Sequence, residues 1–251
     1  MRYDGQALSA DGISVTYSRW GQTVEALRRV SFSIPQGQWV LFIGPNGAGK
    51  TTLLKVLSGS MVPSGGEVRL GEKAIRNMGR LELAANLFYV HQDPLLGTAP
   101  ALTVYENLFV ADHEGQRERE GIKTLRKKYL LMLERVGLKN MLKQPVRDLS
   151  GGERQLITLL IADLRPARII ILDEPFAALD PDRTKICIEE ISRLNSEGRT
   201  IVQVTHDMDF VNGHGDRVIA FKEGQIAYDK SSDDGTVGQT QNVWQGLNIA
   251  K

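Results

Sequence analysis

The chain has 251 residues, of which 41% are hydrophobic and 24% charged, an ordinary composition for a globular protein with one large α/β domain or a core domain carrying a smaller insertion. The 31 basic and 30 acidic residues leave a formal net charge of +1, so no global field directs the chain toward nucleic acid or an anionic membrane. A single cysteine, Cys187, excludes an internal disulfide, and its spacing from Ile191 and Leu194 predicts that it packs in a core.

The first part of the chain has short β-branched and aromatic stretches between Ile13 and Ile34, which predict antiparallel strands. The apolar run Gln38–Ile43 predicts a fully buried strand that stops at Gly44, and Lys50–Leu57 has helical periodicity. No apolar run approaches the roughly 20 residues that span a bilayer, and the N-terminus lacks a hydrophobic signal region. Any membrane span is therefore expected from a partner.

The middle of the chain changes to helix formers with heavy charge, which predicts an inserted helical subdomain at about residues 93–150. We interpret its basic cluster, Lys123–Lys128, as a solvated helix face and not as a nucleic-acid patch. The chain then returns to α/β alternation, with strands and one helix predicted at Arg168–Leu172, Pro181–Asn195, Thr200–Val204, Val218–Phe221 and Gln225–Tyr228. The polar tail, residues 231–251, has Trp244 as its one aromatic anchor, and we assign it no function.

A phosphate-binding loop follows the buried strand. The pattern G-x-x-x-x-G-K-[ST] is matched in full by Gly44, Pro45, Asn46, Gly47, Ala48, Gly49, Lys50, Thr51 and Thr52. The glycines let the backbone wrap around the phosphates of a nucleotide, Lys50 reaches the β and γ oxygens, and the Thr51 hydroxyl is placed to bind Mg²⁺. Strand, loop and helix in this order are the context that the motif requires.

A second apolar run, Ile169–Leu172, predicts a buried strand that ends in two adjacent carboxylates, Asp173 and Glu174. Ligands collect at the C-terminal ends of strands in open α/β sheets. Because side chains alternate along a strand, one carboxylate can face Mg²⁺ while the next points elsewhere. We therefore assign Asp173 to the metal and Glu174 to the water that attacks the phosphate.

The run Leu149–Gln155 contains a serine, two glycines and a glutamate, Ser150, Gly151, Gly152 and Glu153, here called the signature run. A serine with two glycines before a helix offers a helix N-terminus that can bind an anion. The phosphate loop of the same chain already holds one ATP, so this second surface requires a second nucleotide. Two copies of the chain are therefore expected to close around ATP.

With these motifs in this order, the chain resembles the nucleotide-binding domain of ATP-binding cassette (ABC) proteins, over about Ile13 to Tyr228. The resemblance implies that Tyr17 stacks on adenine, that Gln92 senses the γ-phosphate and magnesium while contacting the transport partner, and that His206 contacts the γ-phosphate as a switch. It also implies that the signature run binds nucleotide and that Ala178, Leu179 and Asp180 form a loop between subunits. Trp20 competes with Tyr17 for the adenine role, and His91, His113 and His214 are interpreted as structural or exposed, without metal-ligand spacing to Cys187.

Two segments bear on the resemblance in different ways. Leu156–Leu164 departs from the Ala-rich, Arg-containing helix that is commoner in the family, although the motif residues themselves are intact. Gln92–Pro100, with Leu102–Leu108, resembles a group of bacterial importer subunits, some of them linked to aromatic amino acid uptake. An ATPase subunit does not contact the cargo, so this second likeness indicates a group of transporters and not a substrate.

The fold that the resemblance implies is an α/β P-loop NTPase core with an antiparallel β subdomain and an inserted α-helical subdomain, in one cassette at residues 1–230. The expected function is the ATPase subunit of a bacterial importer, using ATP and Mg²⁺ and lying peripherally on the cytoplasmic face of the membrane. Expected partners are transmembrane permease subunits, a second and identical cassette, and an extracytoplasmic substrate-binding protein, with no nucleic acid. The alternatives are an exporter ATPase, a soluble ABC ATPase acting in translation or DNA maintenance, and a P-loop kinase, which leaves the signature run and Asp180 unexplained.

Overall fold

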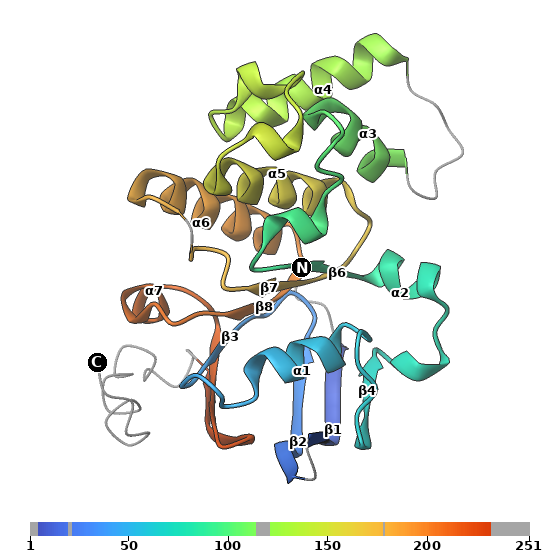
Figure 1. Cartoon of the computed structure of the whole chain (residues 1–251), viewed down its shortest axis with the longest axis vertical. Helices are drawn as coiled ribbons and strands as arrows, with labels where there is room; N and C mark the ends of the chain where they lie inside the picture. The colour runs from blue at the N-terminus through green and yellow to red at the C-terminus, as the bar shows by residue number, and fades with distance from the viewer. Residues whose placement is uncertain (1–4, 20–21, 114–120, 178, 232–251) are drawn as a thin grey trace.

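The computed structural model describes residues 5–19, 22–113, 121–177 and 179–231. They fold into two β-sheets with a helical layer on the far side of the larger sheet (Figure 1). The tail from residue 232 onward and Trp20 lie outside the described residues. No helix in the described ranges is long and apolar enough to cross a membrane.

The larger sheet has six strands in the order β10-β9-β3-β8-β7-β6. Five of them are parallel, and β10 pairs antiparallel to β9 at the edge. Their bounds are β3 Trp39–Ile43, β6 Leu87–Val90, β7 Ile169–Asp173, β8 Thr200–Val204, β9 Arg217–Lys222 and β10 Gln225–Ser231. Because β3, β6, β7 and β8 are parallel, the segments that follow them all leave the sheet at one edge.

Both faces of this sheet are covered, which explains the continuous apolar strands. In β3, Leu41 and Ile43 pack into the core formed with the helical layer, whereas Val40 and Phe42 pack into the core shared with the smaller sheet. The same alternation in β7 sends Ile171 to the face of the smaller sheet.

The smaller sheet is antiparallel, with the order β2-β1-β4-β5. It consists of β2 Gln22–Pro35, β1 Gln6–Arg19, β4 Gly65–Leu70 and β5 Lys73–Ala74. Helix α1, Lys50–Leu57, shares one core with both sheets, and α2, Arg80–Asn86, leads into β6 after the short helix η1, Ile75–Asn77. The antiparallel strands predicted between Ile13 and Ile34 are present, and β4 and β5 add to them.

The helical layer lies on the opposite face of the larger sheet from α1 (Figure 1). Its main helices are α3 Val104–His113, α4 Ile122–Arg135, α5 Gly151–Leu164 and α6 Pro181–Ser196, with α7 Met208–Gly213 near the sheet. Short turns of helix connect them at η2 Pro94–Gly97, η3 Lys139–Met141 and η4 Val146–Asp148. Cys187 on α6 is fully buried in this core, which confirms its predicted packing role.

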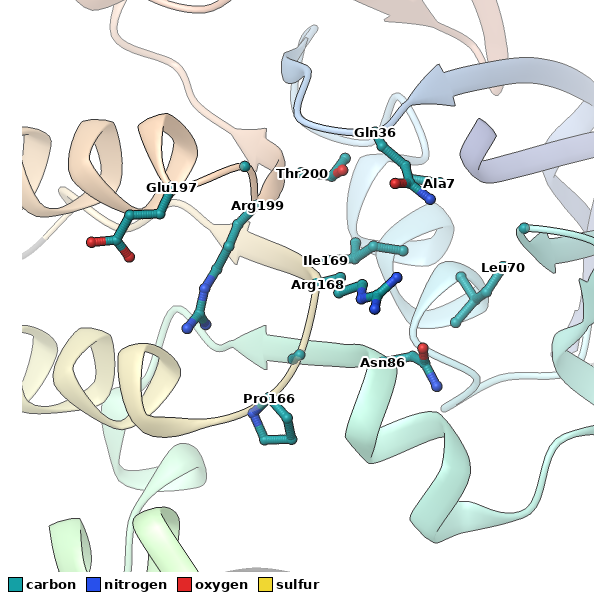
Figure 2. A pocket seen from close by; sticks show the side chains of 13 residues that line it. Ala7, Gln36, Leu70, Asn86, Pro166, Arg168, Ile169, Glu197, Arg199 and Thr200 are labelled. Carbon is teal, nitrogen blue, oxygen red and sulfur yellow. The ribbon is translucent and has the colours of Figure 1, made fainter. Parts of the chain in front are cut away.

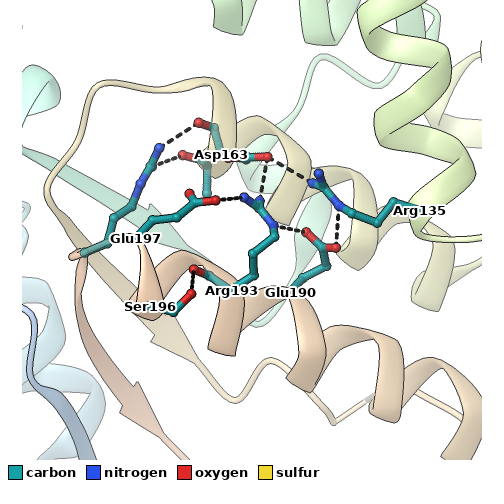
Figure 3. A network of polar contacts seen from close by, with 8 residues as sticks. Arg135, Asp163, Glu190, Arg193, Ser196 and Glu197 are labelled. Atoms are coloured by element: carbon teal, nitrogen blue, oxygen red, sulfur yellow. Dashed lines mark hydrogen bonds and ion pairs between the residues drawn. The ribbon is translucent and has the colours of Figure 1, made fainter.

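A network of ion pairs joins α4, α5 and α6 (Figure 3). Arg135 at the end of α4 contacts Glu190 of α6 at 2.6 Å and Asp163 of α5 at 3.0 Å. Arg193 of α6 reaches the same Asp163 at 2.6 Å and also pairs with Glu197. Since Glu190 is almost completely buried, the network supplies the partners that its charge needs.

Candidate active site

The phosphate loop connects β3 to α1. Gly49 precedes the helix with φ of 98°, and a Cβ there would lie 2.6 Å from the Ala26 carbonyl oxygen, so only glycine fits this approach to β2. Lys50 opens the helix, is buried, and its Nζ donates to the carbonyls of Gly44 at 2.6 Å and Pro45 at 2.9 Å. The ammonium group therefore lies inside the curve of the loop.

Asp173, at the end of β7, is buried beside Tyr89 of β6. The Tyr89 hydroxyl donates to Asp173 Oδ2 at 2.8 Å, which holds one carboxylate oxygen in place. Burial raises the pKa of Asp173, and burial together with the carboxylate raises that of Tyr89. Burial lowers the pKa of Lys50, while the charges of Glu174 and Asp173 oppose that shift. A buried acid and a buried base with perturbed pKa values in one place are typical of a functional site.

Glu174 is the residue at which the chain leaves the sheet. Its φ of 48° is in the left-handed region, which costs a residue with a Cβ about 1 kcal/mol or more. Its backbone N–H donates to the Val204 carbonyl of β8 at 3.2 Å. The side chain lies between two others: Gln92 Nε2 donates to Oε2 at 3.3 Å, and His206 Nε2 is 2.8 Å from Oε1. Three predicted site residues from three strand ends therefore meet at one carboxylate.

Tyr17 of β1 lies beside the first turn of α1. Its hydroxyl is 3.2 Å from Thr52 Oγ1 and 3.4 Å from the Met61 sulfur, and the side chain is 38% exposed. The tyrosine predicted to contact adenine is thus at the edge of the phosphate loop with surface left for a ligand.

The signature run forms a second polar group at the start of α5. Ser150 is the N-cap: its Oγ accepts from the Glu153 N–H at 3.3 Å, and its own N–H donates to Glu153 Oε2 at 2.7 Å. Asp180 caps α6 by accepting from the Arg183 N–H at 2.9 Å. The Arg183 guanidinium donates to Ser150 and to Glu153, so the starts of α5 and α6 lie together. Ala178, part of the predicted loop between subunits, lies outside the described residues.

No hydrogen bond or ion pair within the described ranges joins this second group to the phosphate loop. The signature run begins α5, on the helical face of the larger sheet, whereas α1 lies on the other face (Figure 1). The chain therefore carries two separate polar groups, one built at the strand ends and one at the starts of two helices.

The three histidines that were given no role have ordinary surroundings. His214 stacks on Phe210 and His113 on Phe109, with ring centroids 4.5 and 4.2 Å apart, and His91 packs edge-on against Tyr89. Within the part of the chain that the structure describes, no group of three His, Cys, Asp or Glu side chains is arranged to hold a metal ion.

A cavity of about 400 Å³ opens at the other end of the strands, where β7 and β8 begin (Figure 2). It is lined by residues that include Gln36, Asn86, Arg168 and Thr200. Since Asp173 and Glu174 are at the opposite ends of the strands, this cavity is separate from the site described above.

Residues 27–177 match the ABC transporter family. The chain belongs to this family. It is 34% identical over 215 residues to the tyrosine transport ATP-binding protein of Clostridioides difficile, covering 84% of this chain and 86% of that protein. It is 39% identical over 223 residues to the arabinose import ATP-binding protein AraG 2 of Burkholderia cenocepacia, covering 88% of this chain but only 42% of that longer protein.

Among solved structures, the chain resembles a dimeric ATP-binding cassette in a post-hydrolysis state bound to ADP and Pi. The TM-score is 0.80 at 26% identity, over 89% of this chain and 98% of that one. The ABC family protein described here is accordingly an ATP hydrolase on a P-loop NTPase fold.

Two residues of the site were not found from the sequence. Tyr89 stands in the apolar strand β6 and shares a face with Leu87, and no sequence pattern distinguishes it from an ordinary strand aromatic. Arg183 stands three residues after Asp180, and no sequence pattern places the start of α6 beside the start of α5.

Proposed function

We propose that this ABC protein is the ATPase subunit of a multi-component importer, acting on the cytoplasmic face of the membrane with separate permease subunits. Two identical cassettes close when ATP binds, and hydrolysis reopens them, so the chemistry resets the conformation of the permease. An extracytoplasmic substrate-binding protein delivers the cargo. Import is supported by the name of the arabinose relative, and the two different cargos in the names of the two relatives agree with an ATPase subunit that does not touch the cargo.

The observation that carries this proposal is the division of the polar residues into two groups. The phosphate loop, Asp173, Glu174 and His206 supply one half of a nucleotide site, and the signature run supplies the other half of the partner's site. A second copy in the opposite orientation brings each half against its complement, as a twofold dimer does. The dimeric cassette among the similar structures supports this assembly.

The chemistry that we assign to the first group follows from its contacts. Glu174 is held between Gln92 and His206, so its carboxylate is fixed where it can accept a proton from a water that attacks the γ-phosphate. Lys50 and the N–H groups of the loop neutralise the phosphate charge that develops during transfer. His206 contacts the γ-phosphate and changes neighbours when that group leaves.

Magnesium fits the donors that are present. The Thr51 hydroxyl, the Asp173 carboxylate and the Gln92 side chain offer the hard oxygen ligands that Mg²⁺ prefers, and one or two carboxylates with substrate phosphates are its usual set. When bound, the ion neutralises charge on the β and γ oxygens of ATP. Tyr89 keeps Asp173 oriented for this task through its 2.8 Å hydrogen bond.

We assign the contact with the permease to the surface next to Gln92. A cavity of about 450 Å³ opens beside the end of β6, and three exposed apolar side chains line it, Leu96, Leu102 and Val110. Its lining also includes Tyr89 and His91, on the strand that leads to Gln92. We assign this cavity to an apolar helix of the permease, since a partner there can sense the position of Gln92.

Glu174→Gln tests the catalytic assignment. The change removes the proton acceptor but no phosphate contact, so hydrolysis should fall by roughly 10²-fold or more while ATP and Mg²⁺ still bind. The variant should then accumulate as an ATP-bound dimer, visible by size-exclusion chromatography with ATP.

A matched control is Glu82→Gln on α2, where the glutamate side chain is exposed and pairs with Lys73. It should leave turnover and oligomeric state unchanged. Wild-type turnover by Glu174→Gln would remove this residue from catalysis, and co-purification with membrane proteins tests the transporter assignment separately.

A further inference from the structure

The Arg183 side chain touches both ends of the signature run, Ser150 and Glu153. Its Nη1 donates to Ser150 Oγ at 3.1 Å and its Nη2 to Glu153 Oε1 at 2.9 Å, and the same guanidinium lies 3.5 Å from Asp180 Oδ2. These contacts reach from α6 to the start of α5, across 33 positions of sequence. None of the roles derived above uses this arginine.

The contacts determine what the Ser150 hydroxyl can do. A hydroxyl has one proton to donate and two lone pairs that accept. Ser150 Oγ accepts from the Glu153 N–H at 3.3 Å and from Arg183 Nη1 at 3.1 Å, so both acceptor positions are filled by N–H groups. The proton is thereby directed away from these donors.

Glu153 is a competing acceptor for that proton. Its carboxylate binds the Ser150 N–H through Oε2 and Arg183 through Oε1. The backbone hydrogen bond from Ser150, the Ser150 hydroxyl and the charge of Arg183 all lower the pKa of Glu153, so the carboxylate stays ionised and attracts the serine proton while no phosphate is present. The positive charge of Arg183 weakens that attraction. Arg183 therefore fills an acceptor position on the serine and also holds the competing carboxylate.

Packing fixes the arginine in this position. A Cβ on Gly152 would lie 2.9 Å from Arg183 Cδ and 3.1 Å from Leu179 Cδ2, so the stem of Arg183 crosses directly over the glycine. The absence of a side chain at Gly152 lets the guanidinium reach the serine. The buried glycine and the arginine thus form one unit.

We propose that Arg183 is a positioning residue for the nucleotide site of the partner: by holding Glu153 and one acceptor position of Ser150 Oγ, it frees the Ser150 O–H to donate to the γ-phosphate of ATP held by a second copy of this chain. The inference rests on the proposed function, because Ser150 faces a phosphate only when two cassettes close. Arg183 touches no reacting atom in this arrangement and acts through the serine.

The test is a double-mutant cycle in the Glu174→Gln background, with Arg183→Met and Ser150→Ala alone and combined. The readout is the ATP concentration at half-maximal dimer formation, measured by analytical ultracentrifugation. Each single change should raise this ATP concentration by roughly tenfold. Ser150→Ala removes the hydrogen bond to the phosphate, and Arg183→Met removes the hydrogen bond that positions the serine. The combined variant should be no worse than Ser150→Ala, because Arg183 has nothing left to orient.

Controls separate this result from misfolding. Arg147→Met removes an exposed cation that pairs with Asp148 at 3.7 Å, and it should leave the ATP concentration at half-maximal dimer formation, here called the midpoint, unchanged. ATP binding to the monomer through its own phosphate loop should remain at the wild-type value in every variant. Should Arg183→Met prove unstable, Arg183→Lys keeps the charge and one donor and should give an intermediate midpoint.

The outcomes are distinct. In one outcome, Arg183→Met raises the ATP concentration at half-maximal dimer formation by the same factor with serine and with alanine at position 150. In that case the arginine does not act through the hydroxyl and the proposal is wrong, while the proposed function stands. An unchanged midpoint for Arg183→Met has the same meaning. If Ser150→Ala itself changes neither dimer formation nor hydrolysis, the trans site of the proposed function fails, and this inference fails with it.

Discussion

At the scale of single residues, the candidate site contains ionisable side chains that are almost completely buried. Asp173 and Lys50 are each less than a tenth exposed. Burial raises the pKa of Asp173 and lowers the pKa of Lys50, so it favours the neutral form of each side chain. A folded-state pKa above the unfolded value means that the native chain holds its proton more tightly, so stability falls as pH rises through that range. The site is therefore built at some cost to the stability of the chain.

Asp173→Asn should relieve that cost. Asparagine keeps an oxygen for the Tyr89 hydroxyl and removes the buried charge, so the melting temperature at pH 7 should rise by roughly 2–4 °C, the shift expected for about 1 kcal/mol in a domain of this size. The gain should shrink as pH is lowered and should disappear well below about 3.9, the pKa in the unfolded chain, where the wild-type carboxyl is protonated in both states. Calorimetry without nucleotide measures this, and a lower melting temperature for Asp173→Asn contradicts it.

Tyr17→Ala should weaken nucleotide binding through the base. Stacking on an aromatic ring contributes about 1–3 kcal/mol per base, so ATP affinity should drop by roughly 5- to 100-fold with the Mg²⁺ requirement unchanged. Tyr17→Phe keeps the ring and loses only the contacts to Thr52 and Met61, so it should bind nearly as the wild type does. Isothermal titration decides between them, and a loss caused by Trp20→Ala alone would move the adenine role to Trp20.

Much of this site could be predicted from the sequence because side chains alternate between the two faces of a strand. Alternation along Ile169–Asp173 sends Ile171 to the α1 face, so Asp173 is on the side of Lys50 and Glu174 leaves the sheet. The parallel order of the strands then brings Gln92 and His206 to the same edge. Tyr89 could not be assigned in this way, because its role depends on which strand lies next to β7, and sequence does not state sheet order.

At the scale of elements, α5 is held at both ends. Its first residues are tied to α6 through Arg183, and its last turn joins the network in which Asp163 meets Arg135 and Arg193 (Figure 3). Backbone carbonyls at the same end, those of Ala162 and Asp163, accept from Arg199 at 2.6 and 2.7 Å. These contacts at both ends fix the position of α5, and with it the signature run, relative to α6.

Arg135→Ala should destabilise the packing of α4 on α6. Glu190 is 4% exposed and would keep only Arg193, whose Nε is 3.3 Å away, so part of a buried charge loses its partner. The expected loss is about 1–3 kcal/mol in the free energy of unfolding, measured by urea denaturation. Arg147→Ala, whose ion pair with Asp148 is long and exposed, should change it by about 0.5 kcal/mol or less. Equal effects of the two changes contradict a structural role for the network.

The sequence predicted helices and strands well where apolar residues recur at a clear period. It predicted them poorly where a strand is defined by its pairing with another strand. Lys50–Leu57 and Thr200–Val204 are as predicted, and the strand predicted at Arg168–Leu172 is shifted by one residue, to Ile169–Asp173. The short strands β4 and β5 were missed, because polar and apolar residues alternate over only four positions, Glu67–Leu70, after two glycines, and β4 is defined by its pairing with β1. Neither the α5–α6 contact nor the network has a local signal.

At the scale of the whole molecule, the proposed function requires one chain to hold two unlike halves of a site, and this asymmetry allows a genetic test. In a mixed dimer of Ser150→Arg and Lys50→Ala chains, one composite site takes its phosphate loop from the first chain and its signature run from the second. That site is intact in both halves, and the other site has both changes. Complementation therefore reports on assembly in trans.

The separate variants should each be nearly inactive. Ser150→Arg places a bulky cation where two chains meet and where Arg183 already supplies one, so closure is blocked while the phosphate loop still binds ATP. Lys50→Ala loses the ammonium group that the loop carbonyls position, so nucleotide binding itself weakens. Mixed in equal amounts, half of random dimers are hybrids, each with one intact site. ATP hydrolysis by the mixture should exceed the sum of the separate variants, up to roughly a quarter of wild-type turnover if one site suffices. Activity no greater than that sum, with hybrids present by native mass spectrometry, would place both halves of each site within a single chain.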